Sequence, residues 1–250
     1  KKIAARNGHG HFDLTPGYQP RAATAFSFVP LLVFFEKWGL APPQEDAIKE
    51  TVDVLDRCIA DYKGETPANN NLAKQIALDL QGKLPILYAA VDHIAPVAVR
   101  WQTQINENSK MLAHVNILPE MNHNEILGWP VTTESIGPKF FERAPLYPDG
   151  EPVRPQKDLL PLLSVLYLLD KDDHPRTMYR FEVMKKIIST GYGVPVRVVE
   201  SRGDGLLARM FSLVSLGDFV SVYLGILSAI NPTPVTGIDY LKENLAGFEG

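Results

Sequence analysis

Two short polar segments carry the residues best suited to proton transfer. Glu107 belongs to segment 106–110, whose sequence is Asn-Glu-Asn-Ser-Lys. Glu120 and His123 belong to segment 119–125, whose sequence is Pro-Glu-Met-Asn-His-Asn-Glu. A carboxylate and an imidazole can divide the work of a general base and a general acid. A glutamate at the end of a predicted helix can equally belong to a solvated polar face, so both interpretations are open for Glu107 on its own.

His123 has three interpretations. It is a candidate general acid, a loop histidine held by Asn122 or Asn124, or a metal ligand together with Glu120. A single Glu-x-x-His with no second histidine at ligand spacing is a weak signal for a metal site. His114, which lies on a predicted strand, is expected to be structural.

Two basic residues are further candidates. Arg21 follows Pro20 at the start of a predicted helix at 21–38, where the helix dipole disfavours a positive charge. An anionic ligand would account for an arginine there, and so would a neighbouring carboxylate. Lys242 lies on the last predicted helix beside an apolar stripe. Its simple alternative is a surface lysine that packs its stem along the core.

Alternating strands and helices must position these residues. Short apolar runs bounded by polar segments are typical of parallel strands that are covered on both faces. The predicted strands are 84–90, 111–118, 162–169 and 194–200. Helices are predicted at 44–62, 67–81, 178–190 and 206–230, the last as one helix or two. A further helix follows the first strand, and its apolar stripe is Ile94, Ala98, Trp101 and Ile105.

The ends of these elements suggest where a ligand binds. In open parallel sheets, ligands bind at the carboxyl ends of the strands. Segment 119–125 directly follows the second strand, so we expect Glu107 and His123 near such a crevice. The last helix is predicted to begin at Pro234 with Thr233 as its N-cap. A proline-rich stretch at 143–158 is predicted to be a loop or an insertion.

The composition is that of a soluble globular protein. The 250 residues are 45% hydrophobic and 22% charged, with a net charge of −4 that argues against nucleic acid as a partner. No apolar run approaches the length of a membrane span, so we expect no membrane partner. Cys58 is the one cysteine, which excludes an intrachain disulfide framework and fits a reducing cytoplasm.

Several segments together resemble one family, the bifunctional phosphoglucose/phosphomannose isomerases, which are built from two sugar isomerase (SIS) domains. The matching segments are 100–110, 119–125, 231–235 and Lys242. Segment 19–23 resembles the region near the end of that family's first SIS domain. The matches occur in the expected order over most of the chain.

The resemblance implies an α/β fold. It predicts a three-layer parallel-sheet SIS domain of the flavodoxin-like type at residues 84–250. A helical connector is expected at 41–83, and the carboxyl-terminal tail of a first SIS domain at 1–40.

The resemblance also implies a chemistry. The family interconverts glucose 6-phosphate and mannose 6-phosphate with fructose 6-phosphate through an enediolate, and it needs no metal or other cofactor. The expected partners are a hexose 6-phosphate substrate and a second copy of the chain in a cytoplasmic homodimer with shared active sites.

Residue roles follow from the same resemblance. Glu107 matches the glutamate that moves the proton between C1 and C2, and Arg21 matches the arginine that stabilises the enediolate. His123 matches a ring-opening histidine that comes from the neighbouring subunit. Lys242 matches a lysine that assists at the ring oxygen, and Thr233 matches a substrate-binding hydroxyl near C2. These residue types suit the reaction because a proton alpha to a carbonyl needs a fixed base and an enediolate needs a cation.

One departure from the family leaves alternatives open. The Ser/Thr-rich phosphate-binding loop of the first SIS domain has no counterpart in this sequence. We therefore expect the chain to be the carboxyl portion of a longer enzyme, with poor turnover by itself. The main rival hypothesis is a non-catalytic SIS module that binds or senses a sugar phosphate. A second rival is a metal-dependent isomerase that uses Glu120 and His123.

Overall fold

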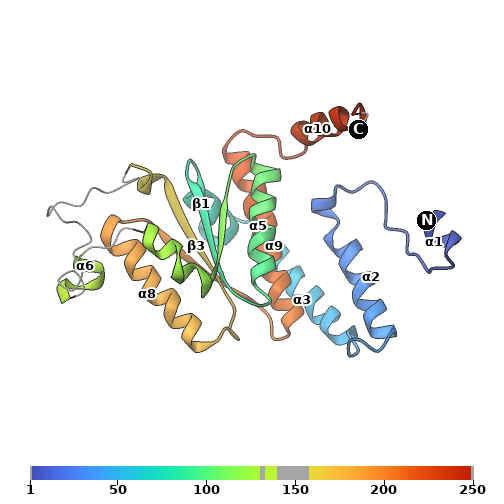
Figure 1. The fold of residues 1–250 in the computed structure, drawn as a ribbon, viewed down its shortest axis with the longest axis horizontal. Coiled ribbons are helices and arrows are strands. Elements are labelled where there is room, and N and C mark those ends of the chain that lie inside the picture. The colour runs from blue at the N-terminus through green and yellow to red at the C-terminus, as the bar shows by residue number, and fades with distance from the viewer. Residues whose placement is uncertain (1, 130–132, 140–157, 249–250) are drawn as a thin grey trace. The chain divides into compact units, whose positions relative to one another are not determined.

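A computed structural model of the protein describes residues 2–129, 133–139 and 158–248 (Figure 1). The chain forms two compact units, residues 1–50 and 51–250. The proline-rich stretch predicted to be a loop at 143–158 lies outside the described residues except for Asp158.

A parallel sheet of four strands forms the centre of the second unit. Its strands lie in the order β2-β1-β3-β4. They are β1 (Leu84–Ala90), β2 (His114–Leu118), β3 (Leu163–Leu169) and β4 (Val196–Glu200). All four predicted strands are confirmed, although β2 and β4 begin later than expected. In the register, Ile86 pairs with His114 on one side and with Val165 on the other.

The two central strands explain the apolar runs in the sequence. Six of the seven residues in β1 and in β3 are buried, because helices cover both faces of the sheet. Pro85 is compatible with the central strand β1 because pairing with β2 begins only at Ile86.

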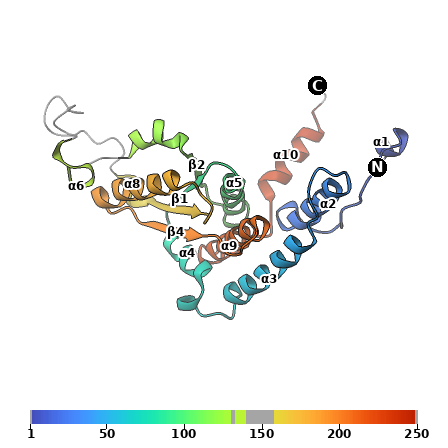
Figure 2. The ribbon, with the colours of Figure 1, turned by 90° about the horizontal axis from the view of Figure 1, so that it is seen from below.

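Helices on both faces complete the three layers that the sequence predicted (Figures 1 and 2). One face is covered by α4 (Leu72–Leu80), α5 (Ala95–Gln104) and α9 (Leu206–Leu227). From Thr51 onward, α3 (Glu45–Tyr62) packs on the outer side of α9 and contributes to the same core (Figure 2). The other face is covered by α8 (Pro175–Tyr192) and two 3₁₀ turns, η4 (Glu120–His123) and η5 (Glu125–Gly128).

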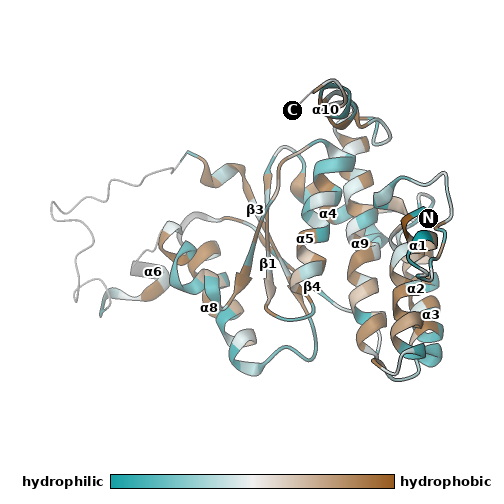
Figure 3. Ribbon diagram, turned by 45° about the vertical axis from the view of Figure 1, so that its right-hand side comes forward, coloured by the Kyte–Doolittle hydropathy of each residue, from teal (hydrophilic) through white to brown (hydrophobic). Residues whose placement is uncertain are grey.

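Helix α9 is the central helix of its layer. Of the helices that the structure describes, it alone is long and apolar enough to cross a membrane, as its colouring in Figure 3 illustrates. Leu213, Leu216, Val220 and Leu224 of this helix are buried in the core over the sheet. We therefore assign α9 as a core helix, and it forms one continuous helix rather than two.

Helix α5 packs closely against α9. The apolar stripe predicted from the sequence is confirmed, since its four residues from Ile94 to Ile105 are at most 1% exposed. The indole nitrogen of Trp101 donates to the carbonyl of Leu213 at 2.8 Å. A side chain at Gly217 would meet Trp101 at 2.4 Å, so this glycine allows the close approach.

The remaining elements are short or lie at the ends of the chain. The second unit also contains α6 (Thr133–Ile136), η6 (Leu160–Leu162) and α10 (Thr236–Ala246). The first unit contains α1 (Lys2–Arg6), η1 (Pro20–Ala22), α2 (Thr24–Lys37) and the start of α3. The predicted connector at 41–83 is divided between the two units, and its helix α4 contributes to the core of the second.

Candidate active site

Glu107 lies on a π-helical turn, η3 (Ile105–Ser109), that continues α5. Such turns place one extra residue in a helix and are frequent at functional sites. The residues that follow Glu107 anchor the turn to α9. The amide of Asn108 donates to the hydroxyl of Ser221 at 2.9 Å, and the hydroxyl of Ser109 donates to the carbonyl of Ser221 at 2.6 Å. The backbone that carries Glu107 is therefore fixed.

A glycine allows α9 to approach this turn. A Cβ atom at Gly225 would lie 2.9 Å from the carbonyl oxygen of Asn108. Real Cβ atoms do not come this close to a backbone oxygen, so only glycine fits here without a shift of η3. The position of Glu107 therefore depends on a residue of α9 far away in the sequence.

Asp218 forms a second anchor behind the turn. Arg100 donates to both carboxylate oxygens of Asp218 at 3.0 Å, and Gln104 donates to Oδ1 at 2.6 Å. Burial raises the pKa of Asp218, and the Arg100 charge opposes that shift. Gln104 is buried, and both Arg100 and Gln104 bind Asp218 of α9. This side of α5 is therefore not a solvated polar face.

A pocket of about 520 Å³ opens beside Glu107. It lies between the end of α5 and the start of α10, and half-buried Glu107 is the one carboxylate in its lining. Its lining residues are Asn106, Glu107, Lys110, Pro234, Val235, Thr236, Gly237 and Ile238. The pocket therefore offers a base with room for a small polar substrate beside it.

The predicted residues near α10 are placed differently from what the sequence suggested. The helix begins at Thr236 with Val235 before it, so Thr233 is not the N-cap. Thr233 instead lies in a turn, where its N–H binds the side chain of Asn231 at 3.0 Å. Lys242 is exposed on α10, about 9 Å along the axis from Thr236 at 1.5 Å per residue. Neither residue lines the pocket.

His123 lies at the opposite end of the strands from Glu107. Gln102 of α5 binds the carbonyl of Ala113 at 2.7 Å, which places the end of α5 beside the start of β2. His123 is exposed on η4, after the other end of β2. The expectation that Glu107 and His123 of one chain share a crevice is therefore wrong, because α5 runs antiparallel to the strands that it connects.

Arg21 belongs to the first unit. It lies in the three-residue 3₁₀ turn η1, and α2 begins only at Thr24. The expected position of Arg21 in the first turn of an α-helix is therefore wrong, and such a short 3₁₀ turn has little dipole. Its approach to Glu107 stays a prediction.

Segment 119–125 has a structural function that the sequence did not reveal. Glu125, not Glu120, is its anchored carboxylate. Glu125 accepts hydrogen bonds from Tyr88 and Asn116, and it lies 2.9 Å from His114. Burial alone would raise the pKa of Glu125, but these three partners lower it below its ordinary range. The expected structural role of His114 is confirmed.

The proposed metal site at Glu120 gains no support from side-chain clustering. Glu120 accepts a hydrogen bond from Asn124 at 3.2 Å. Across residues 2–129, 133–139 and 158–248, no group of three or more His, Cys, Asp and Glu side chains is arranged to hold a metal ion.

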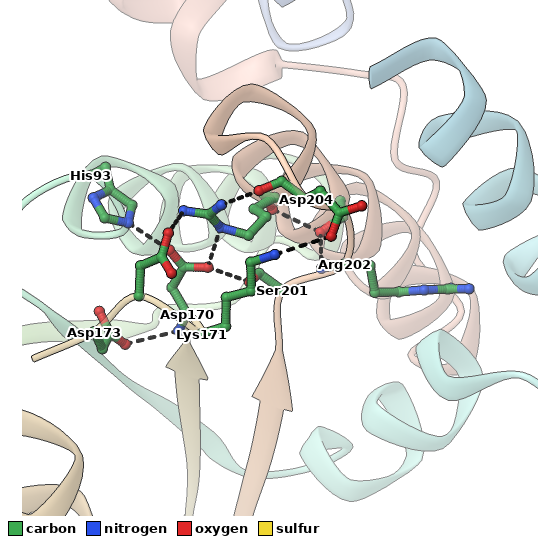
Figure 4. A network of polar contacts seen from close by, with 10 residues as sticks. His93, Asp170, Lys171, Asp173, Ser201, Arg202 and Asp204 are labelled. Atoms are coloured by element: carbon green, nitrogen blue, oxygen red, sulfur yellow. Dashed lines mark hydrogen bonds and ion pairs between the residues drawn. The ribbon is translucent and has the colours of Figure 1, made fainter. Parts of the chain in front are cut away.

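A charge network centred on buried Asp170 lies at the carboxyl ends of the strands (Figure 4). Asp170 follows β3 and has no exposed side-chain surface. Its carboxylate binds Arg209 at 2.8 Å and His93 at 2.6 Å, and it accepts a hydrogen bond from Ser201. Burial would raise the pKa of Asp170, but Ser201, Arg209 and His93 lower it. This network was not predicted from the sequence, although the acidic run directly after the buried strand β3 was a usable signal.

The carboxyl ends of β1 and β3 form the topological switch point of the sheet. The connection from β1 leads to β2 on one side, and the connection from β3 leads to β4 on the other. Ligands of open α/β sheets often bind at such a point. Here the protein's own ion pairs occupy it, since Arg209 also binds Asp172 at 2.5 Å and Lys171 binds Asp204 at 3.2 Å. The pocket with Glu107 lies at the amino ends of the strands.

The fold defines the class of protein as a three-layer α/β domain with one parallel sheet. Residues 69–245 match the family described as the bacterial phospho-glucose isomerase C-terminal SIS domain. The chain therefore belongs to this family, and the resemblance and SIS fold predicted from its sequence are confirmed.

Two relatives carry the same name. The bifunctional phosphoglucose/phosphomannose isomerase of Caldicellulosiruptor bescii is 42% identical over 246 residues, which are 98% of this chain and 65% of that protein. That of Aquifex aeolicus is 30% identical over 242 residues, which are 97% of this chain and 63% of that protein. The chain thus spans less than two thirds of either relative's length.

A solved structure shares the fold. The crystal structure of a glucose-6-phosphate isomerase like protein from Thermus thermophilus superposes with a TM-score of 0.59 at 17% identity. The match covers 87% of this chain and 64% of that chain.

Proposed function

We propose that the chain provides the second SIS domain of a bifunctional phosphoglucose/phosphomannose isomerase. The reaction is the reversible conversion of glucose 6-phosphate or mannose 6-phosphate to fructose 6-phosphate, in the cytoplasm and without a metal. The observation that supports this most is the position of Glu107, on a fixed π-helical turn and in the wall of a 520 Å³ pocket.

The proposed proton transfer needs one base. In the open-chain aldose, the carboxylate of Glu107 removes the proton from C2, and the electron pair forms the C1–C2 double bond of an enediolate. The proton of the O2 hydroxyl then passes to O1, the C2–O2 double bond forms, and return of the proton from Glu107 to C1 gives the ketose. A fixed carboxylate suits this step because it must reach both carbons without rearrangement.

The other proposed roles need groups from outside this pocket. Arg21 stabilises the negative charge of the enediolate, and Lys242 assists at the ring oxygen. Thr233 binds the hydroxyl near C2. His123 opens the ring in the active site of a second copy, which agrees with its exposure at the end of the strands opposite Glu107. We propose a homodimer with shared sites for this reason.

The proposal also concerns a longer protein. Residues 1–40 are proposed to be the tail of a first SIS domain, residues 41–83 a connector and residues 84–250 the second SIS domain. The relatives are longer than this chain, and the first SIS domain is proposed to bind the phosphate. Assays therefore use a joined protein, in which the part of the Caldicellulosiruptor relative that this chain does not match precedes residues 1–250.

The deciding experiment is incorporation of solvent tritium into C2 of glucose 6-phosphate. We expect exchange in the joined protein and a loss of at least about 100-fold in Glu107→Gln, the usual contribution of a general base. Glu120→Gln, which changes an exposed carboxylate on η4, is the matched control and should exchange normally. Binding of glucose 6-phosphate without any exchange would instead establish the non-catalytic binding module, and loss of exchange with a chelator would contradict metal independence.

A further inference from the structure

Lys110 ends the π-helical turn in an unusual conformation. Its φ angle is +55°, in the left-handed region that residues other than glycine seldom adopt. This conformation turns the chain from η3 toward β2. It also directs the side chain of Lys110 back across the end of the turn, where its ammonium meets the segment that leads into α10.

Three backbone carbonyl oxygens accept hydrogen bonds from the ammonium of Lys110. One is the carbonyl of Glu107 itself, and the others belong to Pro232 at 3.2 Å and Pro234 at 2.6 Å. An ammonium has three protons and no acceptor. In each of these contacts the ammonium donates to backbone, so Lys110 is suited to holding the two segments together.

The two sides of this contact are the two walls of the pocket. Glu107 lies on one side, and Val235, Thr236 and Gly237 continue from Pro234 on the other. The acceptors suit a backbone contact because proline has no N–H, so the carbonyl is the only backbone polar group that Pro232 and Pro234 offer. The side chain of Lys110 therefore spans the rim of the pocket.

Helix α10 needs such a contact. None of its residues is buried, and Ile238, Tyr240, Leu241 and Leu245 are all more than 40% exposed. Figure 1 shows α10 beyond the ends of α5 and α9, away from the sheet. Core packing thus contributes little to its position, and polar contacts at its amino-terminal end contribute more.

We infer that Lys110 is a positioning residue that fixes the start of α10 against Glu107. This inference rests on the proposed function, because α10 carries Lys242. The ammonium of Lys110 sets the distance between the backbone carbonyl of Glu107 and segment 232–236. Because this segment leads into α10, the contact also limits the positions that Lys242 can take. Lys110 thus connects the turn that carries Glu107 with the helix that carries Lys242.

Hydrogen–deuterium exchange of residues 231–246 tests the contact without any activity. In the 250-residue chain, we expect Lys110→Met to accelerate exchange of this segment at least about tenfold, since three hydrogen bonds are lost. Exchange of β1 and β3 should not change. Lys110→Arg retains the charge and several donors, so it should restore most of the protection. Lys63→Met, which changes an exposed lysine after α3, is the matched control. Unchanged exchange at 231–246 in Lys110→Met would overturn the inference.

A kinetic measurement tests the positioning role. In the joined protein, Lys110→Met should lower kcat at least about tenfold with little change in KM, because the reacting groups are misplaced while substrate binding is kept. Lys110→Arg should recover part of kcat. If α10 is released but kcat is unchanged, Lys110 is not a positioning residue. If the unsubstituted joined protein has no isomerase activity, the proposed function fails, whereas the exchange result on α10 still decides the contact.

Discussion

Glu107 and His123 lie at opposite ends of the strands of the same sheet: Glu107 comes before β2 and His123 comes after it. The five residues of β2 alone separate them by about 16 Å at 3.3 Å per residue. This is far beyond the reach of a shared hydrogen bond. The proposed action of both residues on one sugar therefore calls for His123 from a second copy of the chain.

Mixing experiments should detect such sharing. Separately inactive Glu107→Gln and His123→Asn versions of the joined protein are combined and allowed to exchange subunits. Half of the random dimers then contain one intact site, so we expect about a quarter of the unsubstituted isomerase activity to return. Mixing each variant with itself is the control. A mixture that stays inactive while mass measurement shows hybrid dimers would contradict shared sites.

Gly225→Ala should damage the site through packing. The new methyl group meets the carbonyl oxygen of Asn108 at 2.9 Å, and backbone cannot move aside as a flexible side chain does. We expect a loss of about 1–3 kcal/mol in the free energy of unfolding, measured by urea denaturation, and a lower kcat. Gly64→Ala has no atom within 4 Å of its added methyl group and should leave both quantities unchanged.

Asp218→Ala should loosen the turn from its other side. The substitution removes the acceptor of Arg100 and Gln104, and Gln104 is only 3% exposed. A buried donor without a partner costs about 1–3 kcal/mol, so the midpoint of urea denaturation should fall. Exposed Asp239 on α10 provides the comparison, and Asp239→Ala should have no measurable effect. Equal midpoints for the two variants would show that the Asp218 contacts contribute little.

Asp170 should make the free energy of unfolding depend on pH in the acidic range. Its pKa is lower in the folded protein than in the unfolded chain, so its contribution is complete above the unfolded value of about 4. That contribution is lost as the pH falls through the folded pKa. Asp170→Asn should cost about 3–5 kcal/mol at pH 7, because it leaves the charge of Arg209 buried. It should also flatten the fall of unfolding free energy in acid.

Asp172 gives a matched control for this prediction. It binds the same Arg209, but its side chain is 60% exposed. Solvent screens such a pair, so Asp172→Asn should cost at most about 1 kcal/mol. If Asp170→Asn and Asp172→Asn have equal effects on unfolding from pH 3 to pH 7, burial does not strengthen the Asp170 contacts.

Most of the fold could be predicted because burial leaves a local pattern in the sequence. The apolar runs of β1 and β3 indicate a sheet that is covered on both faces. The apolar stripe that ends at Ile105 indicates the side of α5 that packs against α9. Both patterns repeat within a few residues, so neighbouring positions suffice to detect them.

The geometry of the site could not be predicted in the same way. The contacts of Lys110 with Pro232 and of Arg209 with Asp170 join residues far apart in the chain, and nothing near either partner records the other. The sequence indicates Glu107 as a candidate residue, but the end of the strands at which it lies follows from the direction of α5, which no local pattern shows. The motif predicts a chemistry for Glu107, and the topology shows at which end of the strands Glu107 lies.

The π-helical turn has a consequence for how this protein can change. One residue contributes about 100° of rotation around a helix axis. Deleting one residue between Ile105 and Ser109 would convert the turn to ordinary α-helix and rotate the following side chains by that angle, with little harm to the strands. Insertions and deletions at this point would therefore remove the proposed activity more readily than they would unfold the protein. The number of residues in the π-helical turn is therefore as important to the site as the carboxylate of Glu107.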